Sequence, residues 1–357
     1  MYQKIYVNAR FLTQKLTGVQ RFAIEISKEL RKLYPYDKLV FVCPYNVIQE
    51  KIAKELGVTI IGTHTGHLWE QIDLPNFLKK NGKPLLLNLC STAPVLYSTK
   101  ISTLHDITFI RFPNTFSWKF RLFYRAITPL ICRGSKHIIT VSEFSKSELS
   151  HFYNLPLESI SVVYNAVTSS FCSEKKNKEN DEYILAVSSL KENKNFPTII
   201  SAFLLLQKEI PNIKLYLIGD LYSNSFNSMS ELLKIIKENE HIKCLGRVDD
   251  SYLIECYNNA IAFIFPSLYE GFGIPPLEAQ ACGCPVVSSN SSSLVEVLKD
   301  SALFNDPMDI NGFANNLRKL VKDVNLRNDL VKKGYVNVNR FSWKNSAQKI
   351  VDIINSL

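Results

Sequence analysis

The chain has 357 residues, which is long for a single hydrophobic core, so we expect two domains. Hydrophobic residues make up 46% of the chain and charged residues 21%, as in ordinary globular enzymes, and no apolar run approaches the roughly 20 residues of a membrane-spanning helix. The net charge of +9 favours an anionic partner, but no nucleic-acid-binding motif accompanies it, and eight scattered cysteines without a C-x-x-C pair indicate a reducing, cytoplasmic compartment.

The first half of the chain alternates short apolar runs with amphipathic segments. Residues 4–9 form the first expected strand, residues 16–20 a polar turn, and residues 21–33 an amphipathic helix. Gly18 in that turn lets a ligand come close to a helix N-terminus, where unpaired N–H groups and the helix dipole favour anions. A plain turn glycine is the alternative.

Three histidines of this half differ in their surroundings. His64 and His67 stand in a loop with no further metal ligands nearby, so we interpret both as loop residues. His105 and Asp106 directly follow a short apolar strand, residues 101–104. Because ligands bind at the carboxyl ends of strands in open α/β sheets, we expect a site role for His105, with Asp106 beside it. A packed structural histidine is the alternative.

Aromatic and basic residues interleave between residues 115 and 153. The stretch Trp118–Arg125 is expected to be helical, and such a helix could dock on anionic lipid headgroups. An ordinary packed helix with a solvated basic face explains the same pattern. Residues 172–181 are polar and charged without apolar periodicity, which predicts a linker between two domains.

The second half is organised around one unit of strand, glycine loop, helix and strand. Residues 262–265 are the first strand, Gly271 and Gly273 lie in the loop, and a Pro-Pro pair suits the first turn of the helix. A glycine loop at a helix N-terminus predicts a phosphate site. Glu270 and Glu278 flank it, and because carboxylates repel phosphate, we expect them to hold neutral partners such as sugar hydroxyls. Ordinary surface and dipole-stabilising glutamates are the alternative.

These two glutamates, with seven residues between them that enclose GFGIPP, resemble the E-x7-E signature of retaining glycosyltransferase family 4. TGVQRF, LHDITFIRFP and the loop around Lys194 resemble other segments of that family in the same order, and their style is that of bacterial surface-polysaccharide enzymes that transfer mannose or rhamnose. The resemblance implies the GT-B fold, with two Rossmann-like domains facing a central cleft and a C-terminal helix that crosses back to the first domain.

The expected boundaries follow from this resemblance and from the linker. Residues 1–171 form the N-terminal acceptor domain, residues 172–181 the linker, residues 182–340 the C-terminal nucleotide-sugar donor domain, and residues 341–357 the helix that returns to the N-terminal domain.

The resemblance also implies roles for individual residues. His105 would lie beside the donor sugar at the reaction centre, with Asp106, and Glu270 would hold the hydroxyls of that sugar. The donor, with its ribose, diphosphate and base, would be bound by Gly18, Lys194, Leu245, Arg247, Val248, Gly271, Phe272, Gly273 and Glu278. Many members carry an additional arginine on the Lys194 loop, where this chain has Ser188 or Ser189.

The implied activity is that of a retaining hexosyltransferase. It would move mannose or rhamnose from a nucleotide-diphosphate sugar to a glycan acceptor on a lipid, in O-antigen or capsule biosynthesis. We find no D-x-D in a suitable loop and expect no metal and no cofactor, with Lys194, the loop amides and the helix dipole supporting the leaving diphosphate. No protein nucleophile stands out, and the resemblance implies a front-face displacement. We expect the enzyme in the cytoplasm, in peripheral contact with anionic membrane.

Two other functions stay open from the sequence. One is a GT-B epimerase acting on a UDP-N-acetylhexosamine, which product analysis without an acceptor would reveal. The other is a nucleotide-sugar-binding protein that has lost catalysis, which a test for donor-dependent turnover would reveal.

Overall fold

The computed structural model describes residues 4–173, 182–220 and 230–357. The chain divides into two compact units, each built on one parallel sheet. Unit 1 consists of Met1–Arg111, Phe116–Asn165 and Ser342–Leu357, and unit 2 consists of Phe112–Thr115 and Ala166–Phe341. Most of the expected linker, from residue 174 to residue 181, lies outside the described residues.

The sheet of unit 1 has seven parallel strands in the order β3-β2-β1-β4-β5-β6-β7. The strands are β1 Ile5–Asn8, β2 Leu39–Cys43, β3 Thr59–Ile60, β4 Leu85–Asn88, β5 Lys100–Thr103, β6 His137–Thr140 and β7 Ile160–Val162. The central strand β1 pairs with β2 on one side and β4 on the other, so the strand order reverses between β1 and β4. Open α/β sheets bind ligands at the carboxyl ends of the strands at such a switch point.

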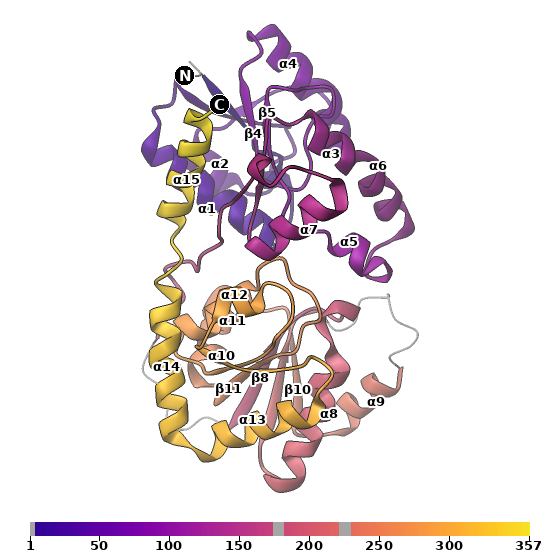
Figure 1. Ribbon diagram of the computed structural model, residues 1–357, viewed down its shortest axis with the longest axis vertical. Helices are drawn as coiled ribbons and strands as arrows, with labels where there is room; N and C mark the ends of the chain where they lie inside the picture. Colours follow the sequence, from indigo (N-terminus) through magenta and orange to yellow (C-terminus); the bar gives the residue numbers. More distant parts are fainter. Residues whose placement is uncertain (1–3, 174–181, 221–229) are drawn as a thin grey trace. The chain divides into compact units, whose positions relative to one another are not determined.

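Helices connect these strands, as expected for a doubly wound sheet (Figure 1). They are α1 Gly18–Leu33, α2 Glu50–Leu56, α3 Gly66–Leu68, α4 Leu74–Lys80, α5 Thr108–Arg111, α6 Trp118–Gly134, α7 Glu143–Tyr153 and α15 Trp343–Asn355. Short 3₁₀ segments span Arg10–Thr13 and Leu157–Ser159, and a π-helical segment spans Trp69–Asp73.

Helix α1 begins three residues earlier than the sequence indicated. We expected a polar turn through residue 20, whereas the helix starts at Gly18, directly after Thr17 in an extended conformation. The apolar spacing had marked only the buried stripe of Phe22, Ile26 and Leu30, and the exposed first turn carries no such signal. Gly18 is therefore the first residue of the helix.

The C-terminal helix α15 belongs to unit 1, as expected for this fold. It packs along α1, and the two helices lie side by side in Figure 1. Trp343 meets the ring of Phe22 at a centroid distance of 6.0 Å, and the Ser346 hydroxyl donates to the Tyr164 carbonyl at 2.7 Å. The end of the chain thus completes the helical layer over the first sheet.

The sheet of unit 2 has six parallel strands in the order β10-β9-β8-β11-β12-β13. The strands are β8 Tyr183–Val187, β9 Lys214–Ile218, β10 Ile242–Gly246, β11 Ala262–Phe265, β12 Val286–Ser289 and β13 Ala302–Asn305. The helices are α8 Phe196–Glu209, α9 Ser230–Glu238, α10 Asp250–Asn259, α11 Ile274–Ala281, α12 Leu294–Leu298, α13 Ile310–Lys322 and α14 Val324–Val338. Here the strand order reverses between β8 and β11. Both sheets are Rossmann-like, which confirms the predicted fold class.

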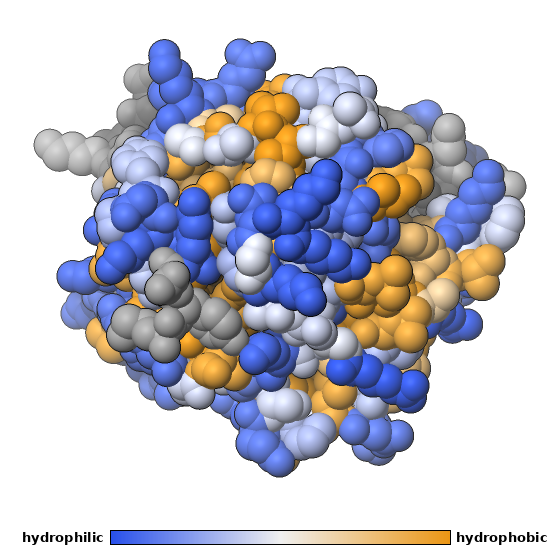
Figure 2. All heavy atoms as spheres, turned by 90° about the horizontal axis from the view of Figure 1, so that it is seen from above, coloured by the Kyte–Doolittle hydropathy of each residue, from blue (hydrophilic) through white to orange (hydrophobic). Residues whose placement is uncertain are grey.

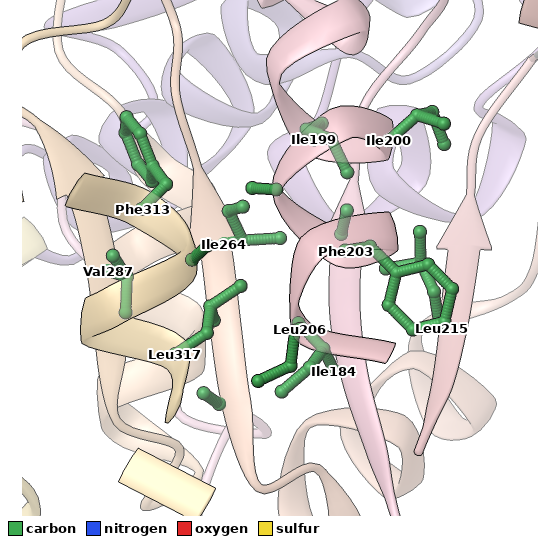
Figure 3. Close-up of a cluster of buried hydrophobic side chains, with 14 of the residues drawn as sticks. Ile184, Ile199, Ile200, Phe203, Leu206, Leu215, Ile264, Val287, Phe313 and Leu317 are labelled. Carbon is green, nitrogen blue, oxygen red and sulfur yellow. The ribbon is translucent and has the colours of Figure 1, made fainter. Parts of the chain in front are cut away.

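The core of unit 2 lies between its sheet and the pair α8 and α13 (Figure 3). Phe203 and Leu206 project from α8, Leu317 projects from α13, and they meet strand side chains such as Ile264. Strand β11 is buried along its whole length, which matches its uninterrupted apolar sequence. This packing holds the ends of β8 and β11 in fixed register.

Two strand boundaries in unit 2 differ from the sequence-based expectation, which places strands at residues 244–248 and 284–288. β10 ends at Gly246, where φ is +68°, so Leu245 lies in the strand and Arg247 and Val248 follow it. β12 begins at Val286 and not at residue 284. Pairing with the neighbouring strand, β9 for β10 and β11 for β12, defines where each boundary lies.

Hydrophilic and hydrophobic side chains are mixed on the surface. Hydrophilic side chains predominate on the face shown in Figure 2, and hydrophobic ones form separate patches between them. Among the helices that the structure describes, none has the length and apolarity needed to cross a membrane.

Candidate functional site

The predicted glycine loop follows β11 at the switch point of unit 2. The main chain of Glu270 is held from both sides: its N–H donates to the Ser292 hydroxyl at 2.9 Å, and its carbonyl accepts from the Ser293 hydroxyl at 3.0 Å. These serines belong to a polar run after β12, so two neighbouring strand ends fix the loop. Gly271 and Phe272 are buried within it.

Gly273 caps the start of α11 and can only be glycine. Its φ is +93°, and a Cβ at this position would stand 2.6 Å from a methyl carbon of Leu294. Pro275 and Pro276 occupy the first turn, as predicted, and carry no N–H. Backbone donors to an anion at this helix start therefore come from the glycine loop and from Ile274, together with the helix dipole.

Lys194 and Glu270 form an ion pair that the sequence did not predict. Lys194 follows β8 and Glu270 follows β11, and their side chains meet at 2.5 Å between Nζ and Oε1. The side chains are 20% and 12% exposed, so solvent still reaches both. We had assigned the lysine to phosphate and the glutamate to sugar, and the structure brings the two groups together at one point.

The loop that carries Lys194 is tied to the β11 loop by two asparagines. Asn193 donates to the Tyr269 carbonyl at 3.1 Å, and its own carbonyl accepts from the Leu268 N–H at 2.8 Å. Asn195, with φ of +54°, donates to the Pro266 carbonyl at 3.2 Å. The two loops therefore hold Lys194 beside Glu270 without relying on the ion pair alone.

Glu278 lies at the fifth position of α11 and is buried. The sequence predicts it in the first turn of the helix, and the structure places it just beyond that turn. It lies close to Tyr257 of α10, which is also fully buried. Burial raises the pKa of the Tyr257 hydroxyl well above its usual value, and the negative Glu278 raises it further. Nothing in the sequence of α10 distinguished Tyr257 from the other tyrosines.

His105 lies two residues beyond β5, in unit 1. Its Nε2 is 3.1 Å from the Leu89 carbonyl, and its ring meets the Phe22 ring edge-on at 5.0 Å. Burial lowers the pKa of His105, and the Leu89 hydrogen bond and the Asp106 charge oppose this only in part. A neutral imidazole that donates from Nε2 keeps Nδ1 as an acceptor, a form that suits binding of a hydroxyl.

Asp106 and Gly18 lie on the same side of unit 1. Asp106 accepts the Thr108 N–H at 2.8 Å, so one of its oxygens shapes the turn into α5. Gly18 is exposed at the start of α1, one helical turn before Phe22, the residue that contacts His105. The side chain of the N-cap residue Thr17 accepts no hydrogen bond from the backbone N–H groups of the first turn of α1.

The expected base-binding residues lie at the edge strand β10 of unit 2. Leu245 is half-buried at the end of the strand. Arg247 is exposed and stands 3.6 Å from the Asp220 carboxylate, and Val248 lies between it and the Asp249 cap of α10. Two strands separate β10 from β11 in the sheet, so these residues are remote from the glycine loop.

Sequence reasoning missed a buried polar cluster in unit 1, which we call the Glu70 cluster. Glu70 is 1% exposed, and its Oε1 accepts from Asn8 at 2.8 Å, Arg10 at 3.2 Å and Thr92 at 3.0 Å. Burial raises the pKa of Glu70, but the Arg10 charge and the hydrogen bonds of the cluster lower it to about 2. The sequence signal that could have indicated this cluster is the pair of polar residues Asn8 and Arg10 at the end of the apolar first strand.

No metal-binding group of three or more His, Cys, Asp or Glu side chains occurs among the described residues. The carboxylates of the candidate site are instead close to Lys194, Tyr257 and Arg10.

Known families match both halves of the chain. Residues 16–171 match Glycosyltransferase Family 4, and residues 170–337 match Glycosyl transferases group 1. A curated relative, the O-antigen chain mannosyltransferase RfbU of Salmonella typhimurium, is 30% identical and covers 96% of this chain and 97% of its own length. The O-antigen chain mannosyltransferase B of Escherichia coli is 28% identical over 71% of this chain and 69% of its own length.

Solved structures share the fold at low sequence identity. Anabaena Alr3699/HepE in complex with UDP-glucose has a TM-score of 0.78 at 18% identity, with both chains covered completely. WaaG, a glycosyltransferase involved in lipopolysaccharide biosynthesis, has a TM-score of 0.70 at 15% identity and covers 98% of this chain and 99% of its own.

Proposed function

The chain is a member of glycosyltransferase family 4, and from this premise we propose that it transfers mannose from a nucleotide-diphosphate sugar to a glycan acceptor on a lipid in O-antigen or capsule assembly. The names of its O-antigen mannosyltransferase relatives support mannose over rhamnose. Unit 2 binds the donor and unit 1 binds the acceptor.

The observation that carries this proposal is the pairing of Lys194 with Glu270 beside the glycine loop of α11. A donor diphosphate placed at the loop would receive the lysine ammonium and the dipole of the helix, while the released carboxylate would accept from sugar hydroxyls. One cation and one carboxylate at hydrogen-bonding distance thus match the two chemically different ends of a nucleotide sugar.

Glu278 supports the same assignment at the nucleotide. A buried carboxylate that can accept two hydroxyl hydrogens suits the paired hydroxyls of a ribose. Tyr257 lies against it and keeps its proton, because its pKa is raised by burial. We assign Glu278 to the ribose and Tyr257 to the positioning of that carboxylate.

We propose that transfer retains the anomeric configuration without a protein nucleophile. A nucleophilic carboxylate has to reach the anomeric carbon. We assign Glu270, once Lys194 has moved to the diphosphate, to the hydroxyls of the sugar, and Glu278 is buried beside Tyr257. Front-face departure of the diphosphate, supported by Lys194, then needs no covalent intermediate. NMR of the product linkage tests this, because an inverted anomer would contradict it.

We also propose that the protein works at the cytoplasmic face of the membrane, through α6. One face of this helix exposes hydrophobic Trp118, Leu122 and Leu130 together with basic Lys119 and Arg125. The opposite face is packed, with Ile127 and Ile131 buried. Exposed apolar and cationic side chains on one helix face suit the boundary between acyl chains and anionic headgroups, where a lipid-linked acceptor would be found.

The test of the activity is transfer of radiolabelled sugar from GDP-mannose, UDP-glucose or dTDP-rhamnose to lipid extracted from a polysaccharide-producing bacterium. We expect label in the lipid fraction from GDP-mannose only. Hydrolysis or epimerisation of the donor without any transfer would contradict the proposal. Thermal shift with the same three donors measures binding independently, since a ligand of the folded state raises its Tm.

A further inference from the structure

The Glu70 cluster lies where a doubly wound sheet binds ligands. Asn8 is the last residue of β1 and Asn88 the last of β4, and their side chains meet at 3.1 Å across the switch point of unit 1. Arg10 directly follows β1, and Thr92 follows β4. In unit 2 the corresponding position, between β8 and β11, is the one that holds Lys194 and Glu270. Position in the fold thus points to a ligand for this cluster as well.

The two oxygens of Glu70 have unequal surroundings. Oε1 accepts from three donors, whereas Oε2 is buried and has no hydrogen-bond partner. Nδ1 of His67 lies 3.4 Å from Oε2, is itself buried and has no other hydrogen-bond partner. If Nδ1 of His67 carries a proton, it can donate that proton to Oε2 of Glu70. Both buried atoms then have a hydrogen-bond partner.

The edge of the His67 ring away from Nδ1 is exposed to solvent. Its side chain is 41% exposed although Nδ1 is buried, so the exposure belongs to the rest of the ring, which includes Nε2. The ring packs on Phe123 of α6 at 4.5 Å, which restricts its rotation. With the proton on Nδ1, Nε2 presents a lone pair at the surface and accepts hydrogen bonds.

We propose that His67 is a specificity residue for the acceptor, whose Nε2 accepts a hydrogen bond from a hydroxyl of the acceptor sugar, with Glu70 and Arg10 as the positioning residues that hold it. This inference rests on the proposed transfer to a glycan. The cluster suits a neutral hydroxyl, because the Arg10 charge is balanced by Glu70 and no excess cation is left for a phosphate.

Saturation-transfer NMR tests the contact without requiring turnover. The probes are methyl α-mannoside, methyl α-rhamnoside and methyl α-galactoside, each added with GDP. We expect at least one probe to receive saturation from the wild-type protein, and His67→Ala to reduce that signal at least fivefold while leaving GDP affinity within twofold. A probe signal that persists in His67→Ala, or wild-type protein that binds none of the probes, overturns the inference.

His64→Ala is the matched control. His64 is 44% exposed and its Nδ1 lies 2.9 Å from an Asp73 carboxylate oxygen. It is therefore a surface histidine with a carboxylate partner, like His67, but it lies outside the Glu70 cluster. It should leave the probe signal unchanged, and an equal loss in both variants would overturn the assignment.

Glu70→Gln tests the positioning step while keeping a side chain of the same size. The glutamine no longer favours the proton on Nδ1, so we expect ¹⁵N shifts of His67 to move toward the Nε2–H tautomer and the probe signal to fall. An unchanged tautomer together with an unchanged probe signal counts against the role of Glu70. Absence of sugar transfer in wild-type protein, with the probe contact intact, would contradict the proposed function and not this contact.

Discussion

Each unit of this protein has a cation–carboxylate pair at the point where its strand order reverses, but the two pairs differ in burial and in partners. In unit 1 the side chains of Arg10 and Glu70 are 8% and 1% exposed, and Asn8 and Thr92 bind the same carboxylate oxygen. In unit 2 the side chains of Lys194 and Glu270 are 20% and 12% exposed, and the ion pair is a single contact.

This difference indicates that Arg10–Glu70 is a fixed pair, whereas Lys194–Glu270 is a pair in which the lysine can exchange its partner. A guanidinium in a network of hydrogen bonds stays in one geometry, whereas an ammonium on a flexible stem can change partners at little cost. We therefore expect Arg10 and Glu70 to keep their contacts through the catalytic cycle. Lys194 is expected to move from Glu270 to the diphosphate when the donor binds.

The largest effect is expected from the exchangeable pair. Lys194→Met removes the cation that we propose supports the leaving diphosphate, and it should lower kcat by a factor on the order of 10³, which is the size of effect seen when one preorganised donor is lost. The control is Lys208→Met, an exposed lysine near the other end of α8. Turnover of Lys194→Met equal to that of the control would show that another group supports the leaving charge.

His105 tests whether unit 1 contributes to the chemical step. His105→Gln keeps a donor for the Leu89 carbonyl and removes the acceptor at Nδ1, so kcat should fall by a factor on the order of 10² with little change in nucleoside-diphosphate affinity. The control is His137→Gln, at the opposite end of the neighbouring strand β6. Near-normal turnover in His105→Gln would return His105 to a packing role.

Lowering the pH should reduce the stability that the Arg10–Glu70 pair contributes. The pKa of Glu70 is about 2 in the folded protein and about 4.5 when unperturbed, so its stabilisation is fully present above pH 4.5 and is lost as pH falls toward 2. The difference amounts to roughly 3 kcal/mol in the free energy of unfolding of unit 1. Glu70→Gln should therefore be less stable than the wild type at pH 7, with the gap narrowing at pH 3.

Tryptophan fluorescence during urea unfolding measures this in unit 1 alone. All three tryptophans, Trp69, Trp118 and Trp343, belong to that unit. A gap between wild type and Glu70→Gln that stays constant from pH 7 to pH 3 would mean that the carboxylate charge contributes no stability.

Membrane binding should depend on unit 1. Arg125→Gln on the exposed face of α6 should weaken binding to vesicles containing anionic lipid about fivefold, since one basic side chain near the surface contributes about 1 kcal/mol. High salt should remove the preference for anionic over neutral vesicles. The control is Lys332→Gln, an exposed lysine of α14 in unit 2. Equal weakening by both substitutions would mean that net charge, and not α6, drives binding.

The smallest effect is expected from removing metal ions. With Lys194 and the start of α11 supporting the diphosphate, EDTA should change turnover by less than twofold. The assay compares EDTA-treated enzyme with and without added magnesium or manganese. Activity that disappears in EDTA and returns with either ion would contradict metal-independent transfer.

The sequence by itself determined the local architecture around the glycine loop of α11. Gly273 and the two prolines after it specify the turn into α11, because only glycine adopts φ of +93° there without strain and proline suits the first helical turn. Uninterrupted apolar runs identified buried parallel strands, and strand–helix alternation predicted two Rossmann-like sheets. Each of these features rests on residues close together in the chain. His105 after a strand and Glu270 before the glycine loop could be identified in the same way, whereas Lys194 was identified only by the family resemblance.

Only the tertiary structure decided which of these groups meet. Lys194 and Glu270 are 76 positions apart, and Arg10 and Glu70 are 60 apart, so no local pattern links them. Lys194 and Glu270 meet because β8 is hydrogen-bonded beside β11, and Arg10 meets Glu70 because the helical segment Trp69–Asp73 packs at the end of β1, where Asn8 also donates to Glu70. Pairing with β9 ends β10 at Gly246 and leaves Arg247 and Val248 beyond the strand. His67 was interpreted from sequence as a loop residue because its partner, Glu70, becomes buried only when Asn8, Arg10 and Thr92 close around it.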